Sequence, residues 1–121
     1  MMTSRRLRKV LVVDDEMSFT RLLKLSLEKT GAYEVRVVNE GARALASARE
    51  FKPDLILLDL VFPDMDGQEV ASLIESDDEM KKIPIIFLTG FPMSKSEVRR
   101  PFLCKPLSVQ EILDFIEHQL A

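Results

Sequence analysis

Side chains that can bind metal ions and phosphate follow four hydrophobic segments of the chain. Asp14 and Asp15 follow residues 10–13, Asp59 follows 55–58, Thr89 follows 85–88 and Lys105 follows 102–104. Crowded carboxylates repel one another unless a cation neutralises them, and an all-oxygen set suits Mg²⁺, which keeps positions for water and phosphate. With a hydroxyl and an ammonium nearby, such a set has the chemistry of phosphoryl transfer, and Asp59 is the candidate nucleophile.

The sequence around Asp59 favours a site role over that of a solvated acid. Asp59 lies between the hydrophobic residues 55–58 and 60–62. A carboxylate in so hydrophobic a stretch is costly to desolvate, which is typical of functional residues. Lys105 has a hydrophobic setting as well, although a lysine at the end of a strand can also extend to solvent. For the acidic pair near the N-terminus, solvation or capping of the next helix is an equally good interpretation.

Five hydrophobic segments predict a parallel β-sheet that is covered on both faces. They are residues 10–13, 34–38, 55–58, 85–88 and 102–104. Most are continuous runs rich in β-branched residues, a pattern typical of strands between two layers of helices. In a doubly wound sheet of this kind, ligands bind beside the carboxyl ends of the strands. The candidate site residues should therefore converge at that edge.

Hydrophobic residues at helical spacing predict helices between these strands. The stripes are Phe19, Leu22, Leu23 and Leu27; Ala42, Leu45 and Ala46; Val70, Leu73 and Ile74; and Val109, Ile112, Leu113, Ile116 and Leu120. Ser108 and Glu111 have the spacing of a capping box, and Gly31 stands where a left-handed residue ends a helix. The predicted fold is α/β, a doubly wound (βα)5 unit with right-handed crossovers.

Length and composition indicate one soluble domain. The chain of 121 residues is expected to comprise a basic arm at residues 1–8 and a folded unit at 9–121. With 17 Lys and Arg against 20 Asp and Glu, the net charge of −3 argues against nucleic acid as a partner. One cysteine and one histidine exclude an internal disulfide and a Cys/His zinc site. No hydrophobic run suits a membrane span or a signal peptide, so we expect the protein in the cytoplasm.

The ordered set of motifs resembles the receiver domain of two-component response regulators. It consists of Asp14-Asp15, the segment Asp59-Leu60-Val61-Phe62-Pro63-Asp64-Met65-Asp66-Gly67, Thr89-Gly90 and Lys105-Pro106, and it covers about residues 9–120. The resemblance implies a flavodoxin-like fold with strand order 2-1-3-4-5 and helices on both faces. It implies a signalling domain rather than a conventional enzyme. The implied partners are a histidine kinase or histidine phosphotransfer protein and a downstream protein or effector domain.

For the acidic residues, the resemblance implies a phosphoacceptor and its metal site. Asp59 resembles the aspartate that takes a phosphoryl group from the donor. Asp14 and Asp15 resemble the acids that bind Mg²⁺ together with this aspartate, and the backbone carbonyl of Val61 is a further implied ligand. Phosphoryl transfer would then depend on magnesium, with weak self-catalysed uptake and loss.

For the hydroxyl and ammonium groups, the resemblance implies a switch. Thr89 and Lys105 resemble the switch hydroxyl and the phosphate-binding lysine. Phe102 is similar to an aromatic residue whose burial accompanies movement of the hydroxyl and reshapes the surface, and an ordinary core aromatic is the alternative. In physical terms, this switch is a population shift between two packings.

The stretch before the last strand departs from the family pattern. The interval between Thr89 and Lys105 is short and contains Pro92 and Pro101. We therefore expect the fourth helix to be reduced to a turn or two around residues 96–100. The output surface would then differ from its usual form.

Two hydrophobic residues occupy positions that, in the family, flank the path of the hydrolytic water. These are Val61, two residues after the phosphoacceptor, and Phe91, two residues after the switch threonine. Neither side chain can orient a water molecule, and Phe91 can shield an acyl phosphate. We therefore expect slow autodephosphorylation, with a rate altered by a polar substitution at Val61 or by Phe91→Ala.

Other functions remain open on the sequence alone. An inactive receiver-like module would use the same fold only as a docking surface, although the complete acceptor set argues against it. A phosphatase of the haloacid-dehalogenase type also uses an aspartyl nucleophile, but it expects Asp-x-Asp where the chain has Asp59-Leu60-Val61. A dinucleotide-binding protein is disfavoured because no glycine-rich loop follows the first strand. The sequence fits a stand-alone receiver and a piece of a longer regulator equally.

Overall fold

A five-stranded parallel sheet organises the molecule, and its strands lie in the order β2-β1-β3-β4-β5. The computed structural model describes residues 6–90, 101–105 and 108–120. The strands are β1 (Arg8–Val13), β2 (Tyr33–Val38), β3 (Leu55–Asp59), β4 (Ile85–Thr89) and β5 (Phe102–Cys104). The predicted doubly wound fold is confirmed, and the change of winding direction between β1 and β3 marks where ligands bind in such sheets.

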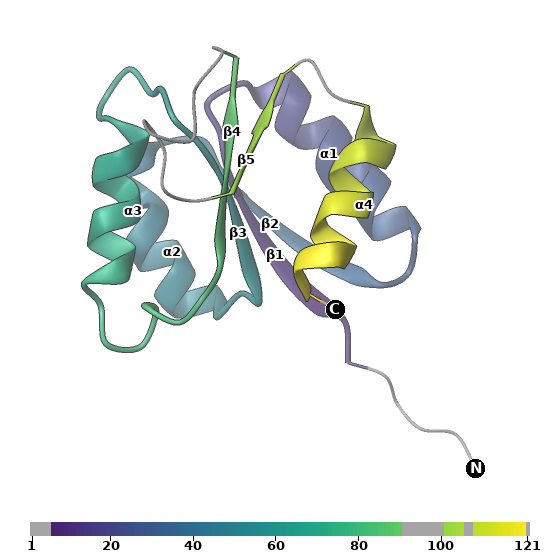
Figure 1. Cartoon of the computed structure of the whole chain (residues 1–121), viewed down its shortest axis with the longest axis horizontal. Coiled ribbons are helices and arrows are strands. Elements are labelled where there is room, and N and C mark those ends of the chain that lie inside the picture. Colours follow the sequence, from purple (N-terminus) through teal and green to yellow (C-terminus); the bar gives the residue numbers. More distant parts are fainter. Residues whose placement is uncertain (1–5, 91–100, 106–107, 121) are drawn as a thin grey trace.

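Helices cover both faces of the sheet (Figure 1). They are α1 (Met17–Lys29), the 3-10 turn η1 (Gly41–Arg43), α2 (Ala44–Phe51), α3 (Gly67–Glu75) and α4 (Val109–Leu120). In Figure 1, α1 and α4 lie on one side of the sheet, and α2 and α3 lie on the other. The short helix expected around residues 96–100 lies outside the described residues, so the label α4 belongs to the helix after β5.

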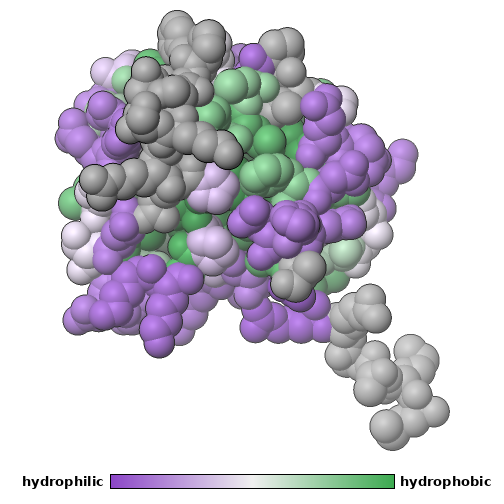
Figure 2. Space-filling view, viewed as in Figure 1, coloured by the Kyte–Doolittle hydropathy of each residue, from purple (hydrophilic) through white to green (hydrophobic). Residues whose placement is uncertain are grey.

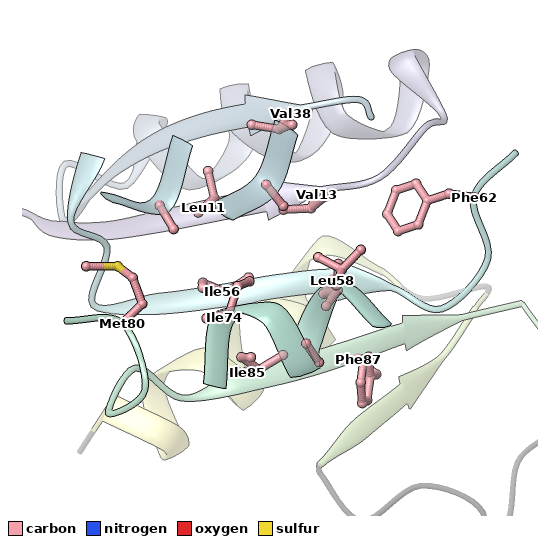
Figure 3. Close-up of a cluster of buried hydrophobic side chains, with 14 of the residues drawn as sticks. Leu11, Val13, Val38, Ile56, Leu58, Phe62, Ile74, Met80, Ile85 and Phe87 are labelled. Atoms are coloured by element: carbon pink, nitrogen blue, oxygen red, sulfur yellow. The ribbon is translucent and has the colours of Figure 1, made fainter. Parts of the chain in front are cut away.

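Hydrophobic side chains fill the space on both sides of the sheet. Successive residues of β1 alternate: Leu11 and Val13 pack toward α2 and α3, and Val10 and Val12 pack toward α1 and α4. Figure 3 shows the first of these clusters, in which side chains of β1, β3 and β4 meet those of α3. Every residue of β3 and β4 is buried. Burial on both faces explains why these segments are continuous hydrophobic runs.

Helix α2 turns a different face to the sheet from the one predicted. Ala44, Ala48 and Phe51 are buried, whereas the predicted stripe placed Ala42 and Ala46 inward, and both of these are exposed. The stripe was wrong because Ala42 belongs to the turn η1, and the α-helical register begins only at Ala44.

Two leucines that were also predicted to face inward are exposed. Leu22 of α1 and Leu73 of α3 have exposed fractions of 58% and 49%. Helix α1 instead buries Thr20, Leu23 and Leu27. Their spacing of three and four residues is a narrower stripe than the sequence suggested, because one helix face is enough to cover the sheet.

The predicted helix ends are confirmed where the structure describes them. Ser108 Oγ accepts a hydrogen bond from the Glu111 N–H at 3.1 Å, and Glu111 Oε1 accepts one from the Ser108 N–H at 3.2 Å, which is a capping box. Gly31 follows α1 with a φ of 80°. Strand β1 begins at Arg8, which the sequence had assigned to the basic arm.

On the face that carries β5 and α4, hydrophilic side chains lie beside a central area of hydrophobic surface (Figure 2). Phe102 and Leu103 of β5 are only half-buried, because β5 is a strand of three residues at the edge of the sheet. Within the described part of the chain, no helix combines the length and the hydrophobicity needed to cross a bilayer.

Candidate functional site

The carboxyl ends of four strands meet at one edge of the sheet and bring the predicted polar residues there. Asp14 and Asp15 directly follow β1, Asp59 ends β3, Thr89 ends β4 and Lys105 directly follows β5. The paired strands end in step with one another, as the register of each pair shows. The hydrophobic strands thus fix these polar groups at one end of the core.

Three carboxylates form the centre of the site. Oxygen atoms of Asp14, Asp15 and Asp59 all lie within 4.8 Å of one another. Asp14 is fully buried and Asp59 is 7% exposed, while Asp15 is more accessible. Burial, and then the charge of Asp14, raises the pKa of Asp59 to about 6. Burial also raises the pKa of Asp14, against the opposing hydrogen bonds from Lys105 and Glu16.

Short turns after the strands hold the buried carboxylates in place. The backbone N–H of Glu16 donates to Asp14 Oδ1 at 2.9 Å, and that of Val61 donates to Asp59 Oδ1 at 3.3 Å. Asn39, which follows β2, donates from Nδ2 to the backbone carbonyl of Asp14 at 2.7 Å. The two local bonds orient the carboxylates, and the bond from Asn39 holds the backbone of Asp14, before any ligand binds.

The Lys105 ammonium lies against the start of α1. Its Nζ donates to Asp14 Oδ2 at 2.7 Å and to Glu16 Oε1 at 2.8 Å, and it lies 4.5 Å from the centre of the Phe19 ring. Burial alone would lower the pKa of Lys105, but the hydrogen bonds with the two carboxylates raise it. Glu16 and Phe19 were not predicted as site residues. The available signal was the third acid in the run that follows β1.

The two residues predicted to act as a switch lie on neighbouring strands. Thr89 is buried, and its backbone carbonyl accepts a hydrogen bond from the Lys105 N–H at 2.6 Å. Phe102 is half-buried and packs against the cluster under α2 and α3. Val61 is 52% exposed, and Phe91 lies outside the described residues. The switching role of Thr89 and Phe102 stays a prediction.

Several hydrogen bonds hold the loop between β3 and α3. The Gly67 N–H donates to the Leu60 carbonyl at 2.9 Å, and Asp66 caps the first turn of α3. Asp64 Oδ2 accepts a hydrogen bond from the Ala42 N–H in η1 at 3.0 Å. The loop lines an open hollow of about 380 Å³. These hydrogen bonds restrain the backbone beside the carboxylates.

The donor set of the three carboxylates fits a hard divalent cation. It offers carboxylate oxygens and no nitrogen or sulfur ligand, which suits Mg²⁺. Lys105 supplies one positive charge, which it shares between Asp14 and Glu16. A divalent cation would therefore offset most of the remaining negative charge and lower the raised pKa of Asp59. Asp14, Asp15 and Asp59 are the side chains that could hold it, and the Val61 carbonyl stays a predicted ligand.

The raised pKa of Asp59 predicts that its charge destabilises the metal-free protein. The folded state holds this proton more tightly than the unfolded state, so the contribution of Asp59 to stability should rise as the pH falls through about 6 toward the ordinary value of 3.8. Asp59→Asn removes the charge and should be more stable than the wild type by up to about 3 kcal/mol at neutral pH, with a smaller difference near pH ~4.5. Thermal unfolding in EDTA at both pH values measures this, and a pH-independent difference would contradict it.

Comparisons with known proteins identify the family. The family model described as the response regulator receiver domain matches residues 10–117. The polar-differentiation response regulator DivK of Brucella anthropi is 34% identical over 119 residues, which cover 93% of this chain and 96% of that protein. DivK of Brucella ovis matches with the same identity and coverage.

Solved structures agree with this family in fold. The chemotaxis protein CheY4 of Vibrio cholerae gives a TM-score of 0.87 at 29% identity, covering 93% of this chain and 98% of that chain. The N-terminal domain of a response regulator receiver protein from Methanoculleus marisnigri gives a TM-score of 0.77 at 30% identity, covering 96% and 98%. The chain therefore belongs to the response regulator receiver domain family, whose members are signalling domains of two-component systems and not conventional enzymes.

Proposed function

We propose that this receiver accepts a phosphoryl group on Asp59 from the phosphohistidine of a histidine kinase or histidine phosphotransfer protein, in a reaction that requires Mg²⁺. The observation that carries the proposal is the setting of Asp59, a buried carboxylate with one oxygen within 4.8 Å of an oxygen of each of two other carboxylates. Membership of the receiver family supports the same role. The phosphorylated surface would then signal to a downstream protein or effector domain in the cytoplasm.

The transfer step uses Asp59 as the nucleophile. One carboxylate oxygen bonds to phosphorus while the bond from phosphorus to the imidazole nitrogen breaks, and that nitrogen keeps the electron pair and takes up a proton. The product is an acyl phosphate on Asp59. The carboxylate reacts in its ionised form, which predominates at neutral pH with a pKa of about 6. The same groups should allow slow uptake from a small donor such as acetyl phosphate.

Positive charge around Asp59 lowers the barrier to this transfer. Mg²⁺ bound by the three carboxylates would supply positive charge to the phosphoryl oxygens. Lys105 supplies a second cation at the same edge of the sheet, with its Nζ 2.7 Å from Asp14 before phosphorylation. The Thr89 hydroxyl donates to a phosphoryl oxygen, and its movement shifts the packing of Phe102.

Berylliofluoride, which mimics a phosphoryl group on an aspartate, tests the proposal without a kinase. In Mg²⁺, the wild type should show saturable shifts of the amide NMR signals of Asp59 and Thr89, and EDTA should abolish them. An inactive docking module with the receiver fold is the second candidate, and it would give no such shifts. That outcome would overturn the proposal.

The exposed hydrophobic side chain of Val61 predicts a long-lived acyl phosphate. Val61 is 52% exposed, lies two residues after Asp59 and offers no polar group to orient an attacking water. Val61→Asn should therefore speed phosphoryl loss several-fold, whereas the apolar control Val61→Ile should not. Intact mass spectrometry over time measures both rates. Equal rates for Val61→Asn and the wild type would contradict the prediction.

A further inference from the structure

We infer that Glu16 and Phe19 form a resting site for the Lys105 ammonium, and that Glu16 is a positioning residue that limits how readily this ammonium reaches a phosphoryl group on Asp59. The inference rests on the proposed function, which gives Lys105 its phosphoryl partner. It adds a competing partner for the same ammonium, supplied by residues at the start of α1.

Three groups hold the ammonium on the α1 side of the site. Lys105 Nζ lies 2.7 Å from Asp14 Oδ2, 2.8 Å from Glu16 Oε1 and 4.5 Å from the centre of the Phe19 ring. Over the residues that the structure describes, the ion pairs of Lys105 are with Asp14 and Glu16, and Asp59 is not among its partners. Its charge also acts on Asp59, but the carboxylates that hold it in place are those of Asp14 and Glu16.

The side chain of Glu16 can be changed without removing a carboxylate from the candidate metal site. Asp14 is one of the three carboxylates that could hold a divalent cation, whereas Glu16 is not. Glu16 precedes α1 with an extended backbone, and its N–H rather than its side chain supports Asp14, at 2.9 Å. A change confined to the Glu16 side chain leaves that backbone bond available. Its effect on phosphorylation would pass through Lys105 and through the repulsion between the charges of Glu16 and Asp14, so the state of Lys105 also has to be measured directly.

A phosphoryl group on Asp59 competes with the resting site for one ammonium. A ligand that binds only the released ammonium gains affinity by the factor by which the resting site is weakened. The Lys105 side chain is 14% exposed, but that of Glu16 is 59% exposed, so solvent screens their ion pair. Removing the Glu16 charge should therefore change affinity by roughly three-fold, the scale of a partly exposed pair.

Berylliofluoride affinity at saturating Mg²⁺ measures this competition. Glu16→Gln should bind berylliofluoride roughly three-fold more tightly than the wild type, and Glu16→Asp, which keeps the charge, should restore most of the wild-type affinity. Glu40→Gln is the matched control for a general change of charge. Glu40 also follows a strand at this edge of the sheet, but it pairs with Arg43 at 3.8 Å. The berylliofluoride affinity of Glu40→Gln should therefore equal that of the wild type.

A second measurement needs neither metal nor phosphoryl analogue. In EDTA, an amine-acylating reagent should modify Lys105 faster in Glu16→Gln than in the wild type, with the exposed Lys52 as the internal reference. Peptide mass mapping gives both rates. A purely structural role of Glu16 would not change the reactivity of this one amine relative to the reference.

The outcomes separate the inference from the proposed function. Equal berylliofluoride affinities in the wild type and Glu16→Gln, or an equal gain in Glu40→Gln, would overturn the inference and leave the proposed function standing. Unchanged acylation of Lys105 in Glu16→Gln would also overturn the resting site. A wild type that binds no berylliofluoride would overturn the proposed function, and this inference with it.

Discussion

The Asp59→Asn variant is expected to take up no phosphoryl group from acetyl phosphate or a phosphohistidine donor, while folding as the wild type does. An amide has nearly the shape of a carboxylate but lacks the charged oxygen that attacks phosphorus. The fold should tolerate the change because it removes a buried charge that burial and Asp14 disfavour. Intact mass spectrometry measures uptake, and circular dichroism measures folding.

The matched control for this variant is a second Asp→Asn change far from the site. Asp78 lies in the loop that leads into β4, and its side chain is 97% exposed. Asp78→Asn should take up phosphoryl at the wild-type rate. Wild-type uptake by Asp59→Asn would mean that another side chain is the nucleophile and would contradict the account.

Replacing Gly67 by alanine should destabilise the protein by about 3 kcal/mol or more, because the added carbon would clash with backbone atoms that cannot easily shift. A Cβ at position 67 would lie 2.2 Å from the Asp59 carbonyl oxygen and 2.6 Å from Leu60 Cα. The chain passes this close because α3 starts directly beside the end of β3. Relief of the clash would displace the strand end that carries Asp59, so phosphoryl uptake should fall as well.

Gly90→Ala provides the comparison for this prediction. A Cβ on Gly90, which directly follows β4 at the same edge of the sheet, would have no atom of the described residues within 4 Å. Its free energy of unfolding should stay within about 0.5–1 kcal/mol of the wild type. Urea unfolding of both variants measures the difference. Similar losses in Gly67→Ala and Gly90→Ala would contradict the steric argument.

The sheet and the edge that carries the site were predictable because buried strands have a simple sequence signature. Hydrophobic runs gave β3 and β4 to within one residue, since strands covered on both faces have no polar side. The residues placed at the strand ends, Asp59 and Lys105 among them, followed from the rule that ligands bind at the carboxyl ends. The backbone topology therefore determined which residues could meet.

Side-chain pairing within the site was not predictable in the same way. Lys105 and Glu16 are 89 positions apart, and their contact depends on how a long lysine side chain lies once β5 has formed. Phe19 belongs to a hydrophobic stripe that also serves the core, so its contact with an ammonium leaves no separate signal in the sequence. The close approach of Gly67 to Asp59 is likewise a property of the folded loop.

Helix faces were the weaker part of the sequence-based prediction. Hydrophobic spacing alone placed Leu22 and Ala42 inward, and both are exposed. The face that a helix buries depends on where its register begins, and a short 3-10 turn such as η1 shifts that point without changing the composition.

The central claim is that Asp59 carries the phosphoryl group, and chemical trapping of the modified residue tests it most directly. Borohydride reduces an aspartyl phosphate to homoserine, which peptide mass mapping locates in the sequence. After incubation with Mg²⁺ and a phosphohistidine donor, the account predicts homoserine at position 59 and none when EDTA replaces Mg²⁺. Homoserine at the position of Asp14 or Asp15, or phosphoryl uptake that leaves position 59 unmodified, would contradict it.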